Sequence, residues 1–118
     1  MIALRAAFVV LLLAASGTAT LADPPAVKHA YSAEIYLSGC KDFIAGRSDF
    51  LGGRCVGALE VLDALSEDTK AFCAPETTNN LERARVVVTY IEARPDRMKE
   101  DFRLLANEAM ANAWPCKK

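Results

Sequence analysis

The fold is decided by residues 50–66, which read FLGGRCVGALEVLDALS. Apolar residues recur in this segment at steps of three and four, the spacing that places side chains on one face of an α-helix. The expected buried stripe consists of Leu51, Cys55, Ala58, Leu59, Leu62 and Leu65. The segment therefore predicts an amphipathic helix that packs against other helices through this stripe.

Three glycines, at positions 52, 53 and 57, lie inside this predicted helix. Each costs about 1 kcal/mol relative to alanine in a helix interior, so we expect a compensating benefit. Gly53 and Gly57 are one turn apart and present a flat strip that a neighbouring helix can approach closely. Glycine in a helix commonly marks such tight packing. We expect the neighbour to belong to the same chain, and a helix of a second copy is the alternative.

The segment before residue 50 predicts another helix of the same kind. Its apolar residues also recur at steps of three and four, and they are Ala33, Tyr36, Leu37, Cys40, Phe43 and Ile44. Residues 45–48, which read AGRS, interrupt the pattern, and Ser48 or Asp49 is expected to cap the helix that follows. Residues 23–30 contain Pro24 and Pro25 and are expected to lead into the first helix without being helical.

A third helix is expected after a polar linker at residues 67–78. It begins near Asn79, with Glu82 as the partner in a capping box. Its apolar stripe is Leu81, Ala84, Val87, Val88 and Ile91. The β-branched run at residues 86–89 leaves a strand as the competing prediction. Helix-forming flanks, and the lack of a second strand for pairing, favour the helix.

A fourth helix is expected after Pro95, with Asp96 as its cap. Its repeating apolar residues are Met98, Phe102, Leu105, Ala106, Ala109 and Ala113. The sequence thus predicts an all-α fold, a small disulfide-stapled bundle of four to five helices.

Residues 1–22 read as a cleavable export signal. Arg5 supplies the positive charge, residues 6–15 form an unbroken apolar run, and small residues precede a cleavage site near Ala22. The run is shorter than the about 20 apolar residues of a membrane helix, so an uncleaved anchor is the less favoured alternative. The mature domain is then 23–118. The formal net charge of the whole chain is −1 at pH 7, and removal of Arg5 with the signal gives the mature domain a net charge of −2. This charge disfavours nucleic acid and anionic membrane as partners.

The cysteines Cys40, Cys55, Cys73 and Cys116 all lie in the mature domain. An even number behind an export signal implies disulfides. A zinc site prefers two close pairs, whereas these gaps are wide and the only histidine, His29, lies far upstream of three of them. If neighbouring helices run antiparallel, the chain favours Cys40–Cys55 at one end and Cys73–Cys116 at the other. Spacing alone leaves the other pairings open.

The sequence carries no motif of a catalytic or cofactor site. A nucleophile elbow, a phosphate loop, His-Glu-x-x-His and a dinucleotide fingerprint are all absent. A cysteine nucleophile needs a free thiol and a base, but these cysteines are expected to be paired and His29 lies in the lead-in. Acidic pairs at 67–68 and 100–101 lie at expected helix ends, where solvation or the helix dipole explains them. We expect no catalytic, cofactor-binding or metal-binding residue and no enzymatic activity.

Short motifs surround the cysteines in a distinctive order. They are GRCVG at 53–57, FCAP at 72–75, YIEARPD at 90–96 and WPC at 114–116. Together they resemble the Rap/Tai family of immunity proteins, which is associated with type VI secretion in Gram-negative bacteria. The resemblance covers roughly residues 37–118. The chain departs from the family pattern at Ala58, often aromatic there, at Val61, often glycine, at Arg94, usually histidine, and at Trp114, usually phenylalanine.

The resemblance implies a periplasmic, mostly helical protein, often a homodimer, that neutralises a toxin delivered by neighbouring or sister cells. In relatives, the toxin is a papain-like, cell-wall-degrading amidase that cuts peptidoglycan peptides. A protruding loop of the immunity protein occludes the active-site groove of that toxin. No motif marks the inhibitory residues in this chain, and the exposed polar stretches 67–80 and 94–100 are the candidates.

Two other functions are open at this point. Small periplasmic helical proteins with disulfides include HdeA-like acid-stress chaperones, which hold unfolded clients. That activity requires acid to expose apolar surface by protonating carboxylates that stabilise the neutral fold. The remaining alternative is an orphan domain for interactions in the cell envelope.

Overall fold

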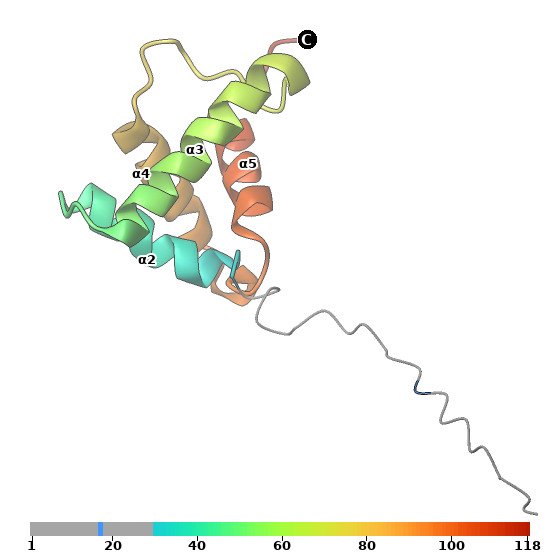
Figure 1. Ribbon diagram of the computed structural model, residues 1–118. Coiled ribbons are helices and arrows are strands. Elements are labelled where there is room, and N and C mark those ends of the chain that lie inside the picture. The colour runs from blue at the N-terminus through green and yellow to red at the C-terminus, as the bar shows by residue number, and fades with distance from the viewer. Residues whose placement is uncertain (1–16, 18–29) are drawn as a thin grey trace, which may run out of the picture.

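The computed structural model describes residue 17 and residues 30–118 (Figure 1). Its elements, in chain order, are α2 (Ala33–Ile44), α3 (Phe50–Thr69), α4 (Asn80–Glu92), the 3-10 turn η1 (Pro95–Arg97) and α5 (Phe102–Ala113). The predicted all-α bundle is confirmed. The expected export signal at 1–22 and the lead-in as far as His29 lie, apart from Gly17, outside the described residues. Among the residues described, no helix is long and apolar enough to span a membrane.

Two predicted caps set the starts of α3 and α4. The Asp49 carboxylate accepts a hydrogen bond from the Gly52 backbone N–H at 2.7 Å. At α4, Asn79 accepts from the Glu82 N–H at 2.9 Å, and the Glu82 carboxylate accepts from the Asn79 N–H at 3.1 Å. This is the predicted capping box, which satisfies two backbone donors that the first turn leaves free. Residues 86–89 lie within α4, so the competing strand prediction is wrong.

The last helix begins later than predicted. Asp96 lies in η1 instead of capping the helix, and Asp101 is the cap, accepting from the Arg103 N–H at 2.9 Å. The reason is that the backbone before α5 pairs with the start of α2. The Ala33 N–H donates to the Glu100 carbonyl at 2.8 Å, and the Glu34 N–H donates to the Met98 carbonyl at 3.0 Å. These bonds hold the chain out of helical geometry until residue 102.

The core lies where α2, α4 and α5 meet one side of α3. Its largest fully buried side chains are Phe72, Phe102, Leu59, Ile91, Leu105, Met110 and Val87, together with Cys40 and Cys55. The Tyr36 ring stacks on Phe102 with 4.6 Å between the ring centroids. Ala113, which was expected in the buried stripe of the last helix, is exposed.

The buried side of α3 is rotated from the predicted stripe. Leu51 and Leu65 are 36% and 53% exposed, so their predicted burial is wrong. The buried residues of α3 are Gly52, Cys55, Leu59, Leu62 and Ser66. This set also has steps of three and four, and it faces the core because the contact with α2 is made through a glycine of α2.

That contact is at Gly39. A Cβ atom at Gly39 would lie 2.1 Å from the Leu51 carbonyl oxygen, so only glycine lets α2 and α3 approach this closely. Nothing lies within 4 Å of the corresponding Cβ positions at Gly53 and Gly57. The prediction that these two glycines pack within the chain is therefore wrong, because they lie on the opposite side of α3 from the core.

Two disulfides join the elements. Cys40–Cys55 joins α2 to α3 beside the Gly39 contact. Cys73–Cys116 joins the segment between α3 and α4 to the C-terminal residues. They are the pairs that antiparallel packing favours. The cysteines of the second bridge are 43 residues apart in the sequence, and those of the first bridge are 15 residues apart. In the chain-entropy view, the longer closure restricts the unfolded chain more.

Candidate binding surface

The two exposed stretches that the sequence marks as binding candidates lie at opposite ends of the bundle (Figure 1). One connects α3 to α4, and the other connects α4 to α5. They are separated by α4, whose 13 residues span about 20 Å. The two stretches therefore form separate surfaces, and one binding groove would not take both.

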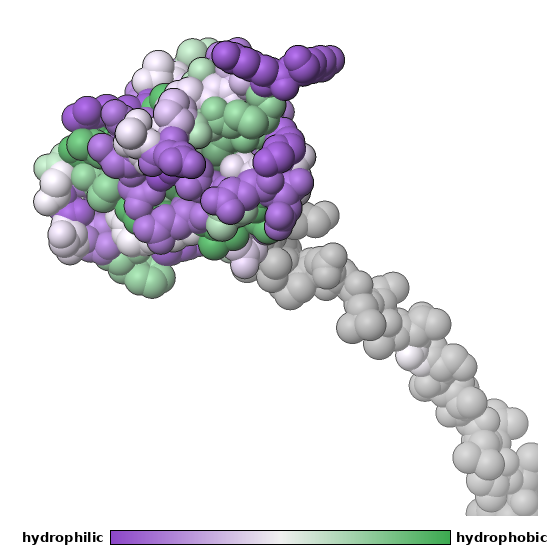
Figure 2. Space-filling view, turned by 90° about the horizontal axis from the view of Figure 1, so that it is seen from above, coloured by the Kyte–Doolittle hydropathy of each residue, from purple (hydrophilic) through white to green (hydrophobic). Residues whose placement is uncertain are grey.

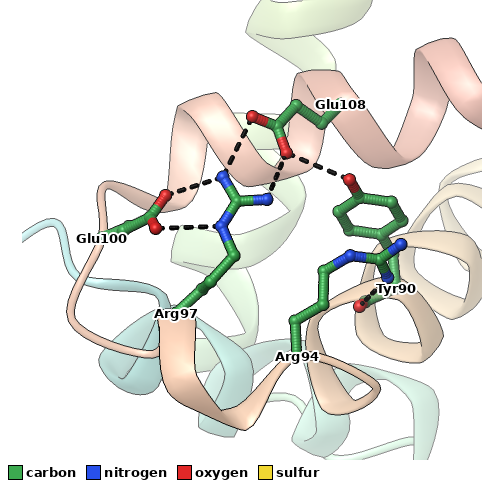
Figure 3. Close-up of polar contacts among 5 residues, drawn as sticks. All are labelled: Tyr90, Arg94, Arg97, Glu100 and Glu108. Carbon is green, nitrogen blue, oxygen red and sulfur yellow. Dashed lines mark hydrogen bonds and ion pairs between the residues drawn. The ribbon is translucent and has the colours of Figure 1, made fainter.

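The stretch between α4 and α5 uses its charged side chains within the domain (Figure 3). Arg97 donates to Glu100 at 2.9 and 2.7 Å and to Glu108 at 2.7 and 3.1 Å. The Tyr90 hydroxyl donates to the same Glu108 carboxylate at 3.0 Å. Arg94 donates to the Tyr90 carbonyl at 2.8 Å, and its guanidinium lies 3.5 Å from the centre of the Tyr90 ring. This network fixes η1 to α5 and α4.

The same contacts set the charge states of the network. Hydrogen bonds from Arg97 hold the pKa of Glu100 and of Glu108 below the ordinary glutamate value. The Arg103 side chain lowers the pKa of Asp101 in the same way. All three carboxylates are therefore ionised at neutral pH. The arrangement is one of structural ion pairs, in which each carboxylate has an arginine partner inside the chain.

The other stretch, residues 70–79, is held differently, and we call it the α3–α4 loop. Its side chains at 75–77 are exposed, while its backbone is anchored at several points. Phe72 is 1% exposed and inserts into the core. The Cys73 N–H donates to the Trp114 carbonyl at 2.8 Å, next to the disulfide, and the Thr78 N–H donates to the Pro75 carbonyl at 2.9 Å. The loop is thus fixed in shape with its tip directed to solvent.

A polar groove of about 690 Å³ runs beside this loop. Asp63, Glu67 and Glu76 supply carboxylates to its walls, and Lys70 and Arg83 supply cations. Arg83 is 9% exposed, and it donates to Asp63 at 2.8 Å and to Asn80 at 3.1 Å. This ion pair, with Arg83 buried and Asp63 half-buried, orders the groove wall where α3 meets α4. The groove and loop together form one continuous shaped surface.

Sequence reasoning found only part of a further surface, the outer side of α3: it marked the strip at Gly53 and Gly57 but not the apolar side chains beside it. Phe50 and Val61 are 77% and 59% exposed there, and Gly57 lines an apolar hollow of about 290 Å³. Arg54 and Arg103 stand at its edge. Figure 2 shows that apolar residues on one face of the domain gather in patches between hydrophilic ones. The signal in the sequence is the recurrence of 50, 57, 61 and 64 at helical steps, which the predicted stripe overlooked.

These surfaces offer shape, apolar area and charge for recognition. In the part of the chain that the structure describes, no group of three or more His, Cys, Asp or Glu side chains could hold a metal ion. All the described cysteines are in disulfides, so none of them offers a thiol. His29, considered above as a base, lies outside the described residues. The described residues therefore present binding surfaces, and among them there is neither a metal-ligand cluster nor a free thiol.

Comparison with known proteins adds one finding. The sequence matches the family model described as Rap1a immunity proteins over residues 13–116. No curated protein and no solved structure gives a significant match.

Proposed function

We propose that this chain, which belongs to the family of Rap1a immunity proteins, protects its producing cell by binding and inhibiting a peptidoglycan amidase delivered as a toxin. Family membership makes it an immunity protein associated with type VI secretion, with a secreted toxin as its partner. Such proteins are typically periplasmic and generally act without catalysis. The amidase, the site of binding and the export route are the further steps of the proposal.

In this proposal, residues 1–22 export the chain and are removed near Ala22. The mature domain, 23–118, then meets the toxin in the periplasm, where peptidoglycan is accessible. It binds no nucleic acid and does not associate with the membrane after cleavage. Two disulfides suit this location, because the periplasm is an oxidising compartment.

The α3–α4 loop is the element that enters the toxin's groove in this proposal. The observation that carries the assignment is the combination of a fixed backbone and an exposed tip. Ordering a loop at the moment of binding costs free energy, and this loop is already ordered by Phe72, by Thr78 and by the Cys73–Cys116 bridge. Inhibition by occlusion needs such a rigid, complementary surface and no catalytic group.

The competing stretch at 94–100 is less suited to the same task. Arg97 and Glu100 already bind one another, and Lys99 pairs with Glu34 at 2.5 Å. A partner would have to break these pairs or accept a surface whose charges are already balanced. Exposed ion pairs are individually weak, at about 0–1 kcal/mol, but their geometry still restricts what the segment presents.

Inhibition of a purified amidase tests the proposal. The probe is a papain-like amidase encoded by the producing strain, and the readout is hydrolysis of a peptidoglycan peptide during titration with the exported protein. We expect stoichiometric loss of activity with the unmodified protein. Glu76→Arg, at the exposed tip of the loop, should raise the inhibition constant at least tenfold.

Asp96→Arg is the matched control, because it makes the same kind of charge reversal at an exposed position of the opposite end. It should leave the inhibition constant within about twofold. The reverse pattern would assign inhibition to the stretch at 94–100. A fully active amidase in the presence of excess unmodified protein would refute this toxin class.

A further inference from the structure

We propose that the Cys73–Cys116 bridge is a redox switch for the α3–α4 loop: a dithiol reductant opens this bridge, leaves Cys40–Cys55 closed and releases the loop. The two bridges lie in different surroundings. Cys40 and Cys55 are both 0% exposed and lie inside the core. Cys73 is exposed and Cys116 is half-buried, at the surface where the C-terminal residues lie beside the end of α3 (Figure 1).

This difference in exposure decides which bridge a reductant can reach. A thiolate of the reductant attacks the sulfur of Cys73 and forms a mixed disulfide, while Cys116 leaves as a thiolate and takes up a proton. The second thiol of the reductant then displaces Cys73 in the same way, and the reductant becomes a cyclic disulfide. Two electrons and two protons thus pass from the dithiol to the bridge. Each attack needs access to a sulfur, which the exposed bridge offers and the core bridge does not.

The Cys73–Cys116 bridge is the covalent attachment between the α3–α4 loop and the C-terminal residues. Beside it, the Cys73 N–H donates to the Trp114 carbonyl at 2.8 Å, and the Cys116 sulfur lies 3.5 Å from the Lys70 carbonyl oxygen. Within the described chain, the backbone of residues 115–118 makes no hydrogen bond to other backbone groups. Once the bridge opens, these residues have neither a covalent link nor a backbone bond that keeps them against the loop.

The release is local, because both ends of the loop have anchors of their own. Phe72 is 1% exposed and remains inserted in the core, and Asn79 belongs to the capping box of α4. Between these anchors, the loop has one backbone hydrogen bond of its own, from the Thr78 N–H to the Pro75 carbonyl at 2.9 Å. A segment with so few bonds opens at a low free energy. Residues 73–78 therefore lose their fixed shape while the bundle stays folded.

This release should weaken inhibition of the toxin, a consequence that rests on the proposed function. A released loop must be ordered again during binding, and that ordering costs free energy. The chain would thus inhibit strongly in an oxidising compartment, where disulfides persist, and weakly where a dithiol reductant is present. The redox state of one surface bridge would set the strength of inhibition without unfolding the domain.

Reduction followed by alkylation tests whether the bridge opens selectively. Dithiothreitol, a dithiol, is added at graded concentrations to the folded, oxidised protein, and iodoacetamide then marks the free thiols for peptide mass mapping. We expect Cys73 and Cys116 to be marked at least tenfold faster than Cys40 and Cys55. In urea, where the fold is lost, all four should react at similar rates. Equal rates in the folded protein, or earlier reduction of the core bridge, would overturn the inference.

Hydrogen exchange tests whether opening the bridge releases the loop. After selective reduction, the amide hydrogens of Cys73 and Thr78 should exchange at least tenfold faster than before. The amides inside α3 should remain slower than both, and circular dichroism should show the same helix content. Unchanged exchange at both loop positions, or a loss of helix content, would overturn the inference as well.

The amidase assay measures the consequence for inhibition. Selective reduction should raise the inhibition constant at least tenfold, and reoxidation should restore it. The double variant Cys73→Ser with Cys116→Ser is the matched control and should show the weaker inhibition with and without dithiothreitol. An inhibition constant that does not change when the bridge opens would refute the switch. If the oxidised protein inhibits no amidase, the proposed function fails, whereas the alkylation and exchange results still decide whether the bridge opens and releases the loop.

Discussion

The contact between α2 and α3 at Gly39 gives a sharp prediction, that Gly39→Ala strongly destabilises the domain. A Cβ at this position would lie 2.1 Å from the Leu51 carbonyl oxygen, 2.6 Å from the carbonyl carbon and 3.1 Å from the Leu51 Cβ. The shortest of these contacts falls about 1.3 Å below the 3.4 Å at which ordinary van der Waals contact begins. Because two of the three atoms belong to the backbone, no side-chain rotation can relieve the clash.

The structure also limits how far the two helices can separate. Cys40, the next residue of α2, is bonded to Cys55 of α3, with 5.1 Å between their Cα atoms. Overpacking in a well-packed core typically costs about 1–3 kcal/mol, and we expect the upper end here because the bridge opposes relaxation. For a domain of this size, a loss of about 3 kcal/mol corresponds to a decrease in Tm of more than about 10 °C.

Chemical denaturation, followed by circular dichroism, measures the free energy of unfolding. Gly53→Ala is the matched control, because it adds the same methyl group to a helical glycine with nothing within 4 Å. At protein concentrations too low for association, it should stabilise the domain by about 0.5–1 kcal/mol, since alanine is the better helix former. Equal effects of the two substitutions would refute the assignment of Gly39 as the close contact.

Three further predictions concern the disulfides, the ion pairs and a helix cap. In the chain-entropy model, replacing Cys73 and Cys116 by serine should lower the free energy of unfolding by about 4 kcal/mol, and replacing Cys40 and Cys55 should lower it by about 3 kcal/mol. Denaturant titration of the two double variants measures both losses. A larger loss for the Cys40–Cys55 bridge would contradict the model. The pKa of Glu108 is lowered by the Arg97 hydrogen bond, so its stabilising contribution is present above the ordinary pKa and is lost as the pH falls through the lowered value. Stability should therefore stay level from pH 7 to about 5 and fall below about pH 4, and Arg97→Ala should shift the Glu108 titration, followed by NMR, toward the ordinary value. An unchanged titration would show that the pair does not form in solution. Asn79→Ala removes the capping-box acceptor and should cost about 1 kcal/mol in thermal unfolding, whereas Thr77→Ala, in the exposed loop, should cost much less.

Local signals predicted α4 well. Its cap, its capping-box partner and its buried stripe all lie within one short segment, so the sequence contains every group that fixes its start and its face. The caps of α3 and α4 were predicted for the same reason. The start of α5 was not, because Asp96 and Asp101 are both suitable caps near Pro95. The choice between them depends on backbone bonds to Ala33 and Glu34, far away in the sequence.

The orientation of α3 shows a different limit of sequence-based prediction. The sequence of this helix contains two overlapping sets with helical spacing, one with Leu51 and Leu65 and the other with Gly52 and Ser66. Hydrophobicity favours the first set, but the structure buries the second. The decision is made by Gly39 on another helix, whose lack of a side chain lets the backbone of α3 approach. A pattern read along one helix does not contain that information.

The candidate site was predicted only in part. Both polar stretches were identified, because neither continues a helical pattern. The two stretches differ in whether their charged side chains are already paired within the domain. That difference depends on tertiary contacts, such as the hydrogen bonds of Arg97 to Glu108 and of the Cys73 N–H to the Trp114 carbonyl. On the outer side of α3, the sequence indicated the strip at Gly53 and Gly57 but not the exposure of Phe50 and Val61, because large apolar side chains are expected in the core until the buried side of the helix is known.

Survival in mixed culture tests the central claim, immunity to a toxin delivered between cells, most directly. A strain that lacks this gene is grown in contact with its parent, and the viable count of each is followed. The account predicts that the count of the deleted strain falls at least tenfold, that it recovers with the unmodified gene but not with Glu76→Arg, and that it does not fall when the parent lacks its secretion machinery. Equal survival of the deleted strain beside a parent with active secretion would contradict the account.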